Sequence, residues 1–465
     1  MAPKFGTSGL RGLVSELTDD LCARYTRAFL GAVGPAGRLW VGRDLRASSP
    51  RIAAAVAETA RAAGVAVMDA GELPTPALAM AAAAAGAPAI MITGSHIPAD
   101  RNGLKFYSPR GEITKAEEVE ITRLAAEDGG PTRAAAPAPL TPDREAAAAY
   151  LARYANFFDP GALAGLTVGI WQHSTVARDL LGALVAALGG TAVALGRSET
   201  FVPVDTEAVS GDTRQMLRRW AAEHRLDAIL SADGDADRPL LADAAGEVIA
   251  GDILGLLTAR ALGADRVVTP VSSNTMIERS GAFARVLRTR IGSPFVIAEM
   301  ETALAEPCRP VGFEANGGFL LGFAAERQGR RLAPLMTRDA VLPLLMPLIA
   351  AREAGQGLAG LVAALPARRT AADRLEGVPT DRSLALVTRL AGDAAERARF
   401  FRGCGSEAGL DLTDGLRVTF ASGLILHLRP SGNAPELRVY AEAGTDADAQ
   451  AALRDGLARA GAATA

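Results

Sequence analysis

Three aspartates at alternate positions give the sequence its clearest chemical signal. Asp233, Asp235 and Asp237 follow the apolar run 228–230. In an extended loop alternate side chains share a side, so the three carboxylates can converge. Converging carboxylates repel one another unless a cation lies among them, and oxygen ligands favour Mg²⁺ or Ca²⁺ over zinc. The loop has too few ligands to enclose Ca²⁺, which indicates a Mg²⁺ ion that is shared with a phosphate. Arg238 can bind that phosphate. The alternative is a solvated acidic turn.

A serine and a histidine follow a second apolar run. Residues 89–92 lead into Thr-Gly-Ser-His-Ile-Pro at 93–98, where Gly94 allows a tight turn beside Ser95. A serine in this place can act as a nucleophile or accept a phosphate, and its alternative role is that of a helix N-cap. No acid or base partner for His96 stands nearby in the sequence, so a serine-hydrolase triad is not supported.

One lysine is notable because lysine is rare in this chain. Among 49 basic residues only Lys4, Lys105 and Lys115 are lysines. Lys105 follows the serine segment, which indicates a need for a compact, titratable ammonium group; retention by chance is the alternative.

Two further polar segments carry chemical groups, the first a carboxylate with an amide and the second groups that suit a phosphate. The run 310–313 leads into Glu-Ala-Asn-Gly-Gly at 314–318, and Arg-Pro-Ser-Gly-Asn-Ala-Pro at 429–435 joins two β runs. The second segment combines a guanidinium, a hydroxyl, an amide and a backbone that glycine makes flexible, and these groups suit a phosphate dianion. An ordinary turn between strands is its alternative, and residues 6–12 have a similar, weaker character.

A repeated pattern predicts the elements that position these segments. A β run, a helical stretch, a glycine or alanine and a second β run recur at 38–67, 166–193 and 266–287. Such βαβ units imply parallel strands, and ligands of open α/β sheets bind outside the carboxyl ends of the strands. Each copy continues to a strand that ends in the serine, the aspartate or the glutamate segment.

The region after residue 365 follows a different pattern. A hairpin at 415–428, a strand at 436–441 and a closing helix at 446–460 predict a small α+β domain. We therefore predict an α/β protein of four domains around a central cleft, three of them similar mixed α/β/α sandwiches. The predicted boundaries are 1–140, 141–250, 251–367 and 368–465.

Composition narrows the class of protein. With 465 residues, of which 49% are hydrophobic, the chain can bury several cores. A net charge of −3 without a basic stripe argues against a nucleic-acid partner, and no targeting or membrane segment is evident. Three widely spaced cysteines exclude a disulfide scaffold and fit a reducing compartment, so we expect a cytoplasmic protein. We also expect a monomer or a homodimer. A phosphoryl-transfer enzyme needs an acceptor, Mg²⁺ and cations that hold phosphate, which this chain provides.

Together the four motifs resemble the α-D-phosphohexomutase superfamily over essentially the whole chain. Its phosphoserine loop is matched by 93–98, its metal loop by 233–238, its sugar loop by 312–317 and its phosphate loop by 429–435. The resemblance implies that Ser95 carries a phosphoryl group, passes it to a hexose phosphate and recovers it from a hexose 1,6-bisphosphate. It implies Mg²⁺ bound by Ser95 phosphate and the three aspartates.

The resemblance also assigns roles to individual residues. The catalytic residues are expected to be Ser95, His96, Lys105, Arg11 and Arg238. The substrate-binding residues are expected to be Thr7, Ser8, Glu314, Asn316, Arg429, Ser431, Gly432, Asn433 and Arg438.

The closest resemblance within the superfamily is to a bacterial phosphomannomutase branch. Residues 314–318, 337–340 and 429–435 carry it, whereas phosphoglucosamine mutases usually have Gln and Ser after the sugar-loop glutamate. The implied reaction converts mannose 6-phosphate to mannose 1-phosphate, which feeds GDP-mannose synthesis. Phosphoglucomutase activity, alone or as a second activity, is the alternative, and phosphoglucosamine mutase activity is less favoured. Gly94, Ile97 and Gly318 depart from the commonest family patterns, as do residues 293–294.

Two classes outside the superfamily remain as alternatives. One is a Mg²⁺-dependent phosphatase that uses an aspartate of 233–238 as its nucleophile. The other is a non-catalytic protein that binds sugar phosphates.

Overall fold

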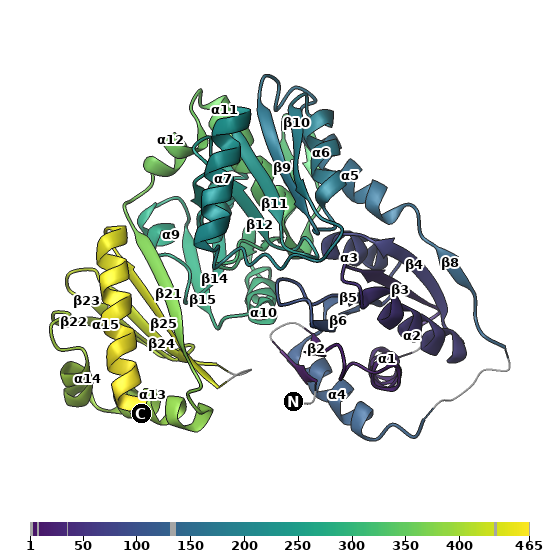
Figure 1. Cartoon of the computed structure of the whole chain (residues 1–465), viewed down its shortest axis with the longest axis horizontal. Helices are drawn as coiled ribbons and strands as arrows, with labels where there is room; N and C mark the ends of the chain where they lie inside the picture. The colour runs from purple at the N-terminus through teal and green to yellow at the C-terminus, as the bar shows by residue number, and fades with distance from the viewer. Residues whose placement is uncertain (1–2, 7–8, 35, 131–135, 432–434, 465) are drawn as a thin grey trace. The chain divides into compact units, whose positions relative to one another are not determined.

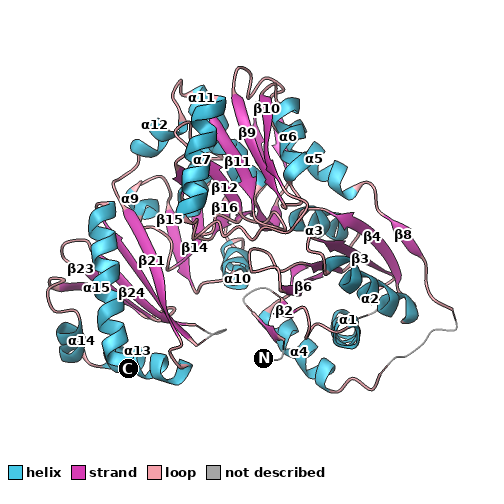
Figure 2. Cartoon of the chain, in the orientation of Figure 1, coloured by secondary structure: helices cyan, strands magenta, loops and turns pink. Residues whose placement is uncertain are grey.

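The protein is described here by a computed structural model that covers residues 3–6, 9–34, 36–130, 136–431 and 435–464. It divides into two compact units (Figure 1). Unit 1 holds Met1–Val267 and Gly292–Leu361, and unit 2 holds Val268–Ile291 and Val362–Ala465. Helices alternate with strands through both units (Figure 2). Among the described helices, none has the length and apolar character that crossing a membrane requires.

The first sheet of unit 1 carries the serine segment. Its strand order is β1-β2-β6-β5-β3-β4-β8, with β7 beside β6. The strands are β1 (Lys4–Phe5), β2 (Leu10–Leu13), β3 (Arg38–Arg43), β4 (Ala66–Glu72), β5 (Ala89–Ile92), β6 (Arg101–Ser108), β7 (Gly111–Glu112) and β8 (Leu140–Pro142). β3 is parallel to β4 and β5, which confirms the first predicted βαβ unit. β6 returns antiparallel to β5 and places Lys105 opposite Met91.

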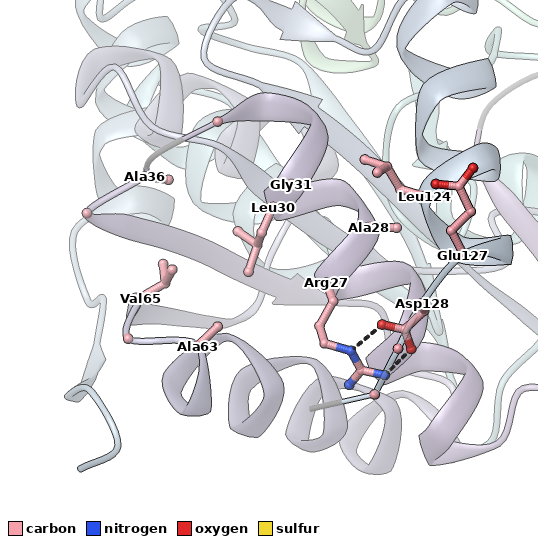
Figure 3. Close-up of a pocket in the computed structure, with 15 residues that line it drawn as sticks. Arg27, Ala28, Leu30, Gly31, Ala36, Ala63, Val65, Leu124, Glu127 and Asp128 are labelled. Carbon is pink, nitrogen blue, oxygen red and sulfur yellow. Dashed lines mark hydrogen bonds and ion pairs between the residues drawn. The ribbon is translucent and has the colours of Figure 1, made fainter. Parts of the chain in front are cut away.

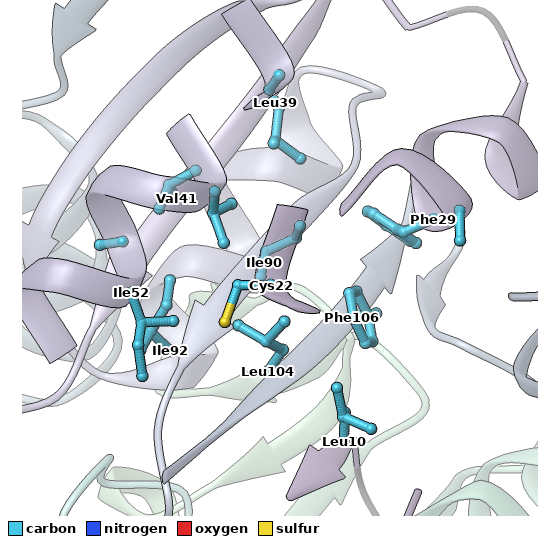
Figure 4. Packing of buried hydrophobic residues seen from close by; sticks show 14 of the residues in the cluster. Leu10, Cys22, Phe29, Leu39, Val41, Ile52, Ile90, Ile92, Leu104 and Phe106 are labelled. Carbon is cyan, nitrogen blue, oxygen red and sulfur yellow. The ribbon is translucent and has the colours of Figure 1, made fainter. Parts of the chain in front are cut away.

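Four helices accompany this sheet. They are α1 (Asp19–Val33), α2 (Ser49–Ala62), α3 (Thr75–Ala84) and α4 (Lys115–Ala126). α1 begins after Thr18, whose side chain accepts the Leu21 N–H, and α4 begins with a capping box between Thr114 and Glu117. Leucine, isoleucine and phenylalanine side chains from β2, β5, β6, α1 and α2 form the core (Figure 4). The rings of Phe29 and Phe106 meet there at 5.0 Å.

The second sheet of unit 1 carries the aspartate segment. Its order is β10-β9-β11-β12-β13, with β9 parallel to both β10 and β11 as the second βαβ unit predicts. Its strands and helices are α5 (Ala146–Phe157), β9 (Thr167–His173), α6 (Arg178–Ala187), β10 (Thr191–Arg197), α7 (Gly211–His224), β11 (Ala228–Ala232), β12 (Pro239–Ala242) and β13 (Val248–Ile249). β12 is antiparallel to β11, so residues 233–238 form a hairpin turn. The expected extended loop is therefore a tight turn, in which Ala236 has a φ of 58°.

A third group of strands in unit 1 carries the glutamate segment. β16 (Pro310–Phe313) pairs antiparallel with β17 (Phe319–Leu321), and β17 with β20 (Leu335–Asp339). The other elements here are α8 (Gly251–Ala261), α10 (Ser293–Ala303), β18 (Ala325–Arg327), β19 (Arg330–Leu332) and α11 (Val341–Glu353). Residues 314–318 therefore turn between antiparallel strands, as 93–98 and 233–238 do. The chain passes from one unit to the other three times: within β14 (Arg266–Pro270), between Ile291 and Gly292, and within α12 (Leu358–Ala363).

Unit 2 contains the α+β region that the sequence predicts. Its antiparallel sheet has the order β21-β25-β24-β23-β22. Its elements are α9 (Met276–Arg279), β15 (Arg285–Thr289), β21 (Arg369–Glu376), α13 (Thr380–Gly392), α14 (Ala394–Phe400), β22 (Glu407–Asp411), β23 (Leu416–Phe420), β24 (Ile425–Pro430), β25 (Glu436–Ala443) and α15 (Asp446–Thr464). The predicted hairpin at 415–428 is confirmed by the antiparallel pairing of β23 with β24.

Candidate active site

Ser95 lies buried at the end of β5 with its hydroxyl directed at an aspartate. Ser95 Oγ donates a hydrogen bond to Asp233 Oδ2 over 2.6 Å, and His96 Nδ1 lies 3.3 Å from Ser95 Oγ. The backbone of Ser95 has a φ of 54°, in the left-handed region that costs a non-glycine residue about 1–2 kcal/mol. Its N–H donates to Thr93 Oγ1 over 2.7 Å, which helps to hold this conformation.

The three aspartates of residues 233–238 converge as the sequence predicts. All three are fully buried, and one carboxylate oxygen from each lies within 4.8 Å of the others. Asp233 Oδ1 accepts from the backbone N–H groups of Asp237 and Arg238, both over 3.2 Å. The Oδ1 atoms of Asp235 and Asp237 are buried and accept no hydrogen bond from any described residue. Buried acceptors without a donor are expected where a cation binds, and three carboxylates match the oxygen ligands of Mg²⁺.

The carboxylates differ in their electrostatic surroundings. Burial raises the pKa of Asp233 well above its ordinary value, and the charges of Asp235 and Asp237 add to the rise. Burial also favours a higher pKa for Asp237, but the charges of Arg338 and Lys105 outweigh it and lower that pKa below its ordinary range. The fixed cations therefore compensate Asp237 most fully, and a bound divalent cation would relieve the repulsion at Asp233.

Cationic side chains surround the cluster. Lys105 Nζ, from β6, donates to Asp235 Oδ2 over 2.5 Å and to Asp237 Oδ2 over 2.6 Å. Arg11, on β2, is close enough for burial and the charges of Arg238 and Arg338 to lower its pKa to about 10, so it stays protonated at neutral pH. A site rich in fixed cations next to a serine hydroxyl can hold a phosphoryl group and stabilise its charge during transfer.

His96 is held as a neutral imidazole. Its Nδ1 accepts a hydrogen bond from Arg238 over 2.8 Å. Burial lowers the pKa of His96, and the guanidinium groups of Arg238 and Arg11 lower it further. An imidazolium at this place is strongly disfavoured, so His96 can orient Ser95 and Arg238 but does not store a proton at neutral pH.

The glutamate segment is linked to the aspartates through an arginine. Arg338, on β20, is 1% exposed and donates to Asp237 Oδ2 over 2.8 Å and to Glu314 Oε2 over 3.2 Å. Asn316 is buried, and its Oδ1 accepts from the backbone of Gly318 over 3.0 Å. Glu314 thus belongs to the same hydrogen-bonded assembly as the aspartates.

The remaining predicted residues belong to unit 2 or lie outside the described residues. Arg429 Nε donates to Asp414 Oδ2 over 2.8 Å, and that oxygen also accepts from the backbone of Ile291 over 2.9 Å. Arg438 stands opposite Arg429 on the neighbouring strand, and the backbone N–H of Ser431 donates to Glu436 O. Thr7, Ser8, Gly432 and Asn433 lie outside the described residues.

Several residues that organise these groups were not predicted from the sequence. They are Asp44, Arg46, Thr75, Phe201, Arg338 and Asp414. Thr75 Oγ1, at the start of α3, donates to Asp235 Oδ2 over 2.6 Å. Asp44 and Arg46 follow directly after β3, so the rule that ligand sites form at the carboxyl ends of parallel strands could have indicated them.

A cavity in unit 1 lies apart from these residues. It has a volume of about 1080 Å³ and contacts the ends of α1 and α4, where Arg27 pairs with Asp128 (Figure 3). None of the residues that line it belongs to the four predicted segments. The described residues of its walls are mostly glycine and alanine, and the Arg27 charge is already paired with Asp128, so the buried aspartates are the stronger candidate for chemistry.

Comparisons with known proteins show the family of the chain. Three domains described as phosphoglucomutase/phosphomannomutase match the chain: alpha/beta/alpha domain I over residues 2–129, alpha/beta/alpha domain III over 250–368 and the C-terminal domain over 363–460. The chain therefore belongs to the phosphoglucomutase/phosphomannomutase family of the α-D-phosphohexomutase superfamily.

Individual relatives cover nearly the whole chain. A phosphomannomutase of Sinorhizobium fredii is 48% identical over 468 residues, covering 98% of each chain. A phosphomannomutase of Salmonella muenchen is 44% identical over 450 residues, covering 96% of this chain and 93% of its own. The crystal structure of a phosphoglucomutase/phosphomannomutase family protein from Burkholderia thailandensis superimposes with a TM-score of 0.78 at 22% identity, covering 98% of this chain and 97% of that one, which supports the fold.

Proposed function

We propose that the protein is a phosphomannomutase, which interconverts mannose 6-phosphate and mannose 1-phosphate through a phosphorylated Ser95. The hydrogen bond of 2.6 Å from Ser95 Oγ to Asp233 carries this proposal, because it places an acceptor hydroxyl on a buried carboxylate cluster. The high identity to the two curated phosphomannomutases supports mannose as the sugar. The cationic side chains around Ser95 in unit 1 support its proposed role as the acceptor.

The three aspartates are proposed to hold Mg²⁺. Asp235 and Asp237 each offer a buried Oδ1 atom that accepts no hydrogen bond from the described residues, and Asp233 offers the oxygen that Ser95 now contacts. Mg²⁺ bound here would supply charge neutralisation for the phosphoryl group that is transferred. The protein itself orients the carboxylate of Asp235, because Thr75 and Lys105 both donate to its Oδ2 atom.

The proposed reaction moves one phosphoryl group in each direction. The phosphorus–oxygen bond to Ser95 breaks, a bond to the hexose hydroxyl forms, and the hydroxyl proton ends on Ser95 Oγ in the net exchange. Lys105 and Arg238 are placed to stabilise the charge that spreads over the phosphoryl oxygens. The resulting hexose 1,6-bisphosphate then returns its other phosphate to Ser95, and added bisphosphate would prime an unphosphorylated enzyme.

Substrate recognition is proposed to use the predicted segments 314–318 and 429–435. Glu314 and Asn316 would bind sugar hydroxyls, and the assembly through Arg338 supports this by fixing one Glu314 oxygen. The phosphate that does not react would be bound by the predicted residues of unit 2, with Arg429 oriented by Asp414. We retain the four predicted domains, 1–140, 141–250, 251–367 and 368–465, as the organisation behind this division of roles. A cytoplasmic monomer or homodimer remains our expectation, and the free thiols of Cys22, Cys308 and Cys404 suit a reducing compartment.

Phosphorus NMR tests the reaction and the sugar together. Mannose 1-phosphate, glucose 1-phosphate and glucosamine 1-phosphate are incubated separately with the enzyme, Mg²⁺ and a trace of hexose 1,6-bisphosphate. The proposal expects a 6-phosphate signal that grows fastest from mannose. Equal growth from glucose would make the enzyme a dual phosphomannomutase/phosphoglucomutase, and glucosamine in the lead would refute the choice of branch. Release of inorganic phosphate alone would instead indicate a phosphatase.

A further inference from the structure

Arg46 uses its whole guanidinium to hold the serine segment. Nε donates to Asp44 Oδ2 over 3.1 Å. The four other N–H groups donate to backbone carbonyls of Pro98, Arg101, Ser95 and Ile97, over 2.7, 2.9, 3.0 and 2.6 Å. Because arginine has five N–H groups, every side-chain donor of Arg46 is used. The residue is 2% exposed, so these bonds are made away from water.

The partner of Arg46 ties the same segment from its other side. Asp44 Oδ2 accepts from Thr93 Oγ1 over 2.8 Å as well as from Arg46, and Thr93 Oγ1 in turn accepts the N–H of Ser95. The N–H and the C=O of Ser95 are thus both fixed by this one ion pair and its threonine. A serine with a left-handed backbone conformation needs such constraints, since that conformation is unfavourable by itself.

Arg46, Asp44 and Thr93 together form a clamp on the serine segment. Phe201 connects this clamp to the aspartates. The Arg46 Cζ atom lies 3.8 Å from the centre of the Phe201 ring, which is a cation–π contact. The same ring packs on Gly234, where a Cβ would come within 2.9 Å of it and within 2.8 Å of the Ser95 carbonyl oxygen. Phe201 therefore contacts both Arg46 and the turn that carries Asp233.

We propose that Arg46, stacked on Phe201, is a positioning residue that sets the distance between the Ser95 hydroxyl and the aspartates for phosphoryl transfer. Arg46 contributes no net charge to the reacting centre, because Asp44 neutralises it. Its effect is therefore geometric and falls on the transfer step rather than on substrate binding. This inference rests on the proposed phosphoserine reaction.

The test compares Arg46→Lys with a matched variant of another buried arginine. Lysine keeps the charge, but its three donors cannot serve four carbonyls and a carboxylate. We expect Arg46→Lys to lower kcat by about 100-fold while KM changes little, since misplacement of about 1 Å costs that much. The control is Arg397→Lys in unit 2. Arg397 is also a buried arginine, bound to Glu407 and to the carbonyls of Leu390 and Ala391. Its replacement should leave kcat at the wild-type value.

Two further variants separate position from folding. Arg46→Ala should regain part of its kcat when millimolar guanidinium is added, because the small cation can refill the clamp. Phe201→Leu should lower kcat by about tenfold or less, with Mg²⁺ affinity retained. The inference is overturned if Arg46→Lys keeps a kcat within about twofold of the wild type, or if its loss equals that of Arg397→Lys and follows the fraction of folded protein. Failure of the proposed function is distinct, because the wild-type enzyme would then show neither turnover nor phosphate on Ser95.

Discussion

Gly318 and Arg338 share a space that only one side chain can fill. A Cβ on Gly318 would lie 2.7 Å from Cδ and 2.9 Å from Cγ of Arg338. These atoms belong to the stem of a fully buried side chain whose guanidinium is bound to Asp237 and Glu314, so the stem cannot easily move. The absence of a side chain at 318 thus permits the link between Asp237, a proposed Mg²⁺ ligand, and Glu314.

Gly318→Ala is expected to break this link. The added methyl group should displace Arg338 and lower kcat/KM by about 10- to 100-fold, because Arg338 would no longer connect Asp237 with Glu314. Gly182→Ala is the matched control, since a Cβ at Gly182 in α6 meets no atom within 4 Å. Steady-state kinetics of both variants provide the measurement, and equal activity would show that Arg338 does not organise the site.

Asp235→Asn is expected to weaken Mg²⁺ binding and to slow transfer by orders of magnitude. The substitution removes one of three buried carboxylate charges and leaves an amide beside Lys105. Calorimetric titration with Mg²⁺ measures the affinity directly. Asp179→Asn, at an exposed ion pair with Arg197, serves as the control. Unchanged Mg²⁺ affinity in Asp235→Asn would remove the aspartate cluster from the proposed mechanism.

Thr75→Val tests whether a neighbouring hydroxyl orients the same aspartate. Valine keeps the shape of threonine but cannot donate to Asp235 Oδ2, so we expect Mg²⁺ affinity to fall by about tenfold. Thr26→Val is a suitable comparison, because Thr26 is equally buried and its hydroxyl donates only to Cys22 O within its own helix. A loss of affinity in both variants, or in neither, would contradict the assigned role of Thr75.

His427 is expected to make stability depend on pH. Burial lowers the pKa of His427 to about 4, although the hydrogen bond to Asp414 O opposes the shift. Below the ordinary pKa of about 6.5 the unfolded chain binds a proton that the folded protein does not accept. The free energy of unfolding should therefore decrease as pH falls from about 6.5 to about 4, by up to about 3 kcal/mol from this group.

Urea unfolding at several pH values, followed by circular dichroism, measures this dependence. His427→Gln can still donate to Asp414 O but does not titrate, so its unfolding free energy should fall less steeply over that pH range than that of the wild type. Identical slopes for the two proteins would show that His427 is not the group responsible.

Sequence patterns alone predicted β5, β11 and β16, the loops that follow them, and the parallel direction of the first two βαβ units. The reason is that β5, β11 and β16 are short apolar runs followed by turn residues, a local signal that needs no knowledge of distant contacts. The convergence of Asp233, Asp235 and Asp237 was also predicted, although the hairpin turn replaces the extended loop that was expected. The antiparallel strands β6, β12 and β17 that follow the loops were not predicted.

The supporting residues were not predicted because their roles depend on long-range contacts. Thr75 and Asp235 are 160 positions apart, and Arg338 and Asp237 are 101 positions apart. Arg46 is one of many arginines in the chain, so its residue type carried no signal. Lysine was informative at Lys105 for the opposite reason, since it is rare and the structure places it between two aspartates.

Transfer of a phosphoryl group to Ser95 is the most direct test of the account. The full-length protein and its Ser95→Ala variant are incubated with Mg²⁺ and hexose 1,6-bisphosphate, and intact mass and peptide mapping locate the added group. The account predicts one phosphoryl group on Ser95 of the wild type, its discharge when mannose 1-phosphate is added, and neither labelling nor turnover in the variant. Full turnover of Ser95→Ala, or a phosphoryl group on one of the aspartates, would contradict it.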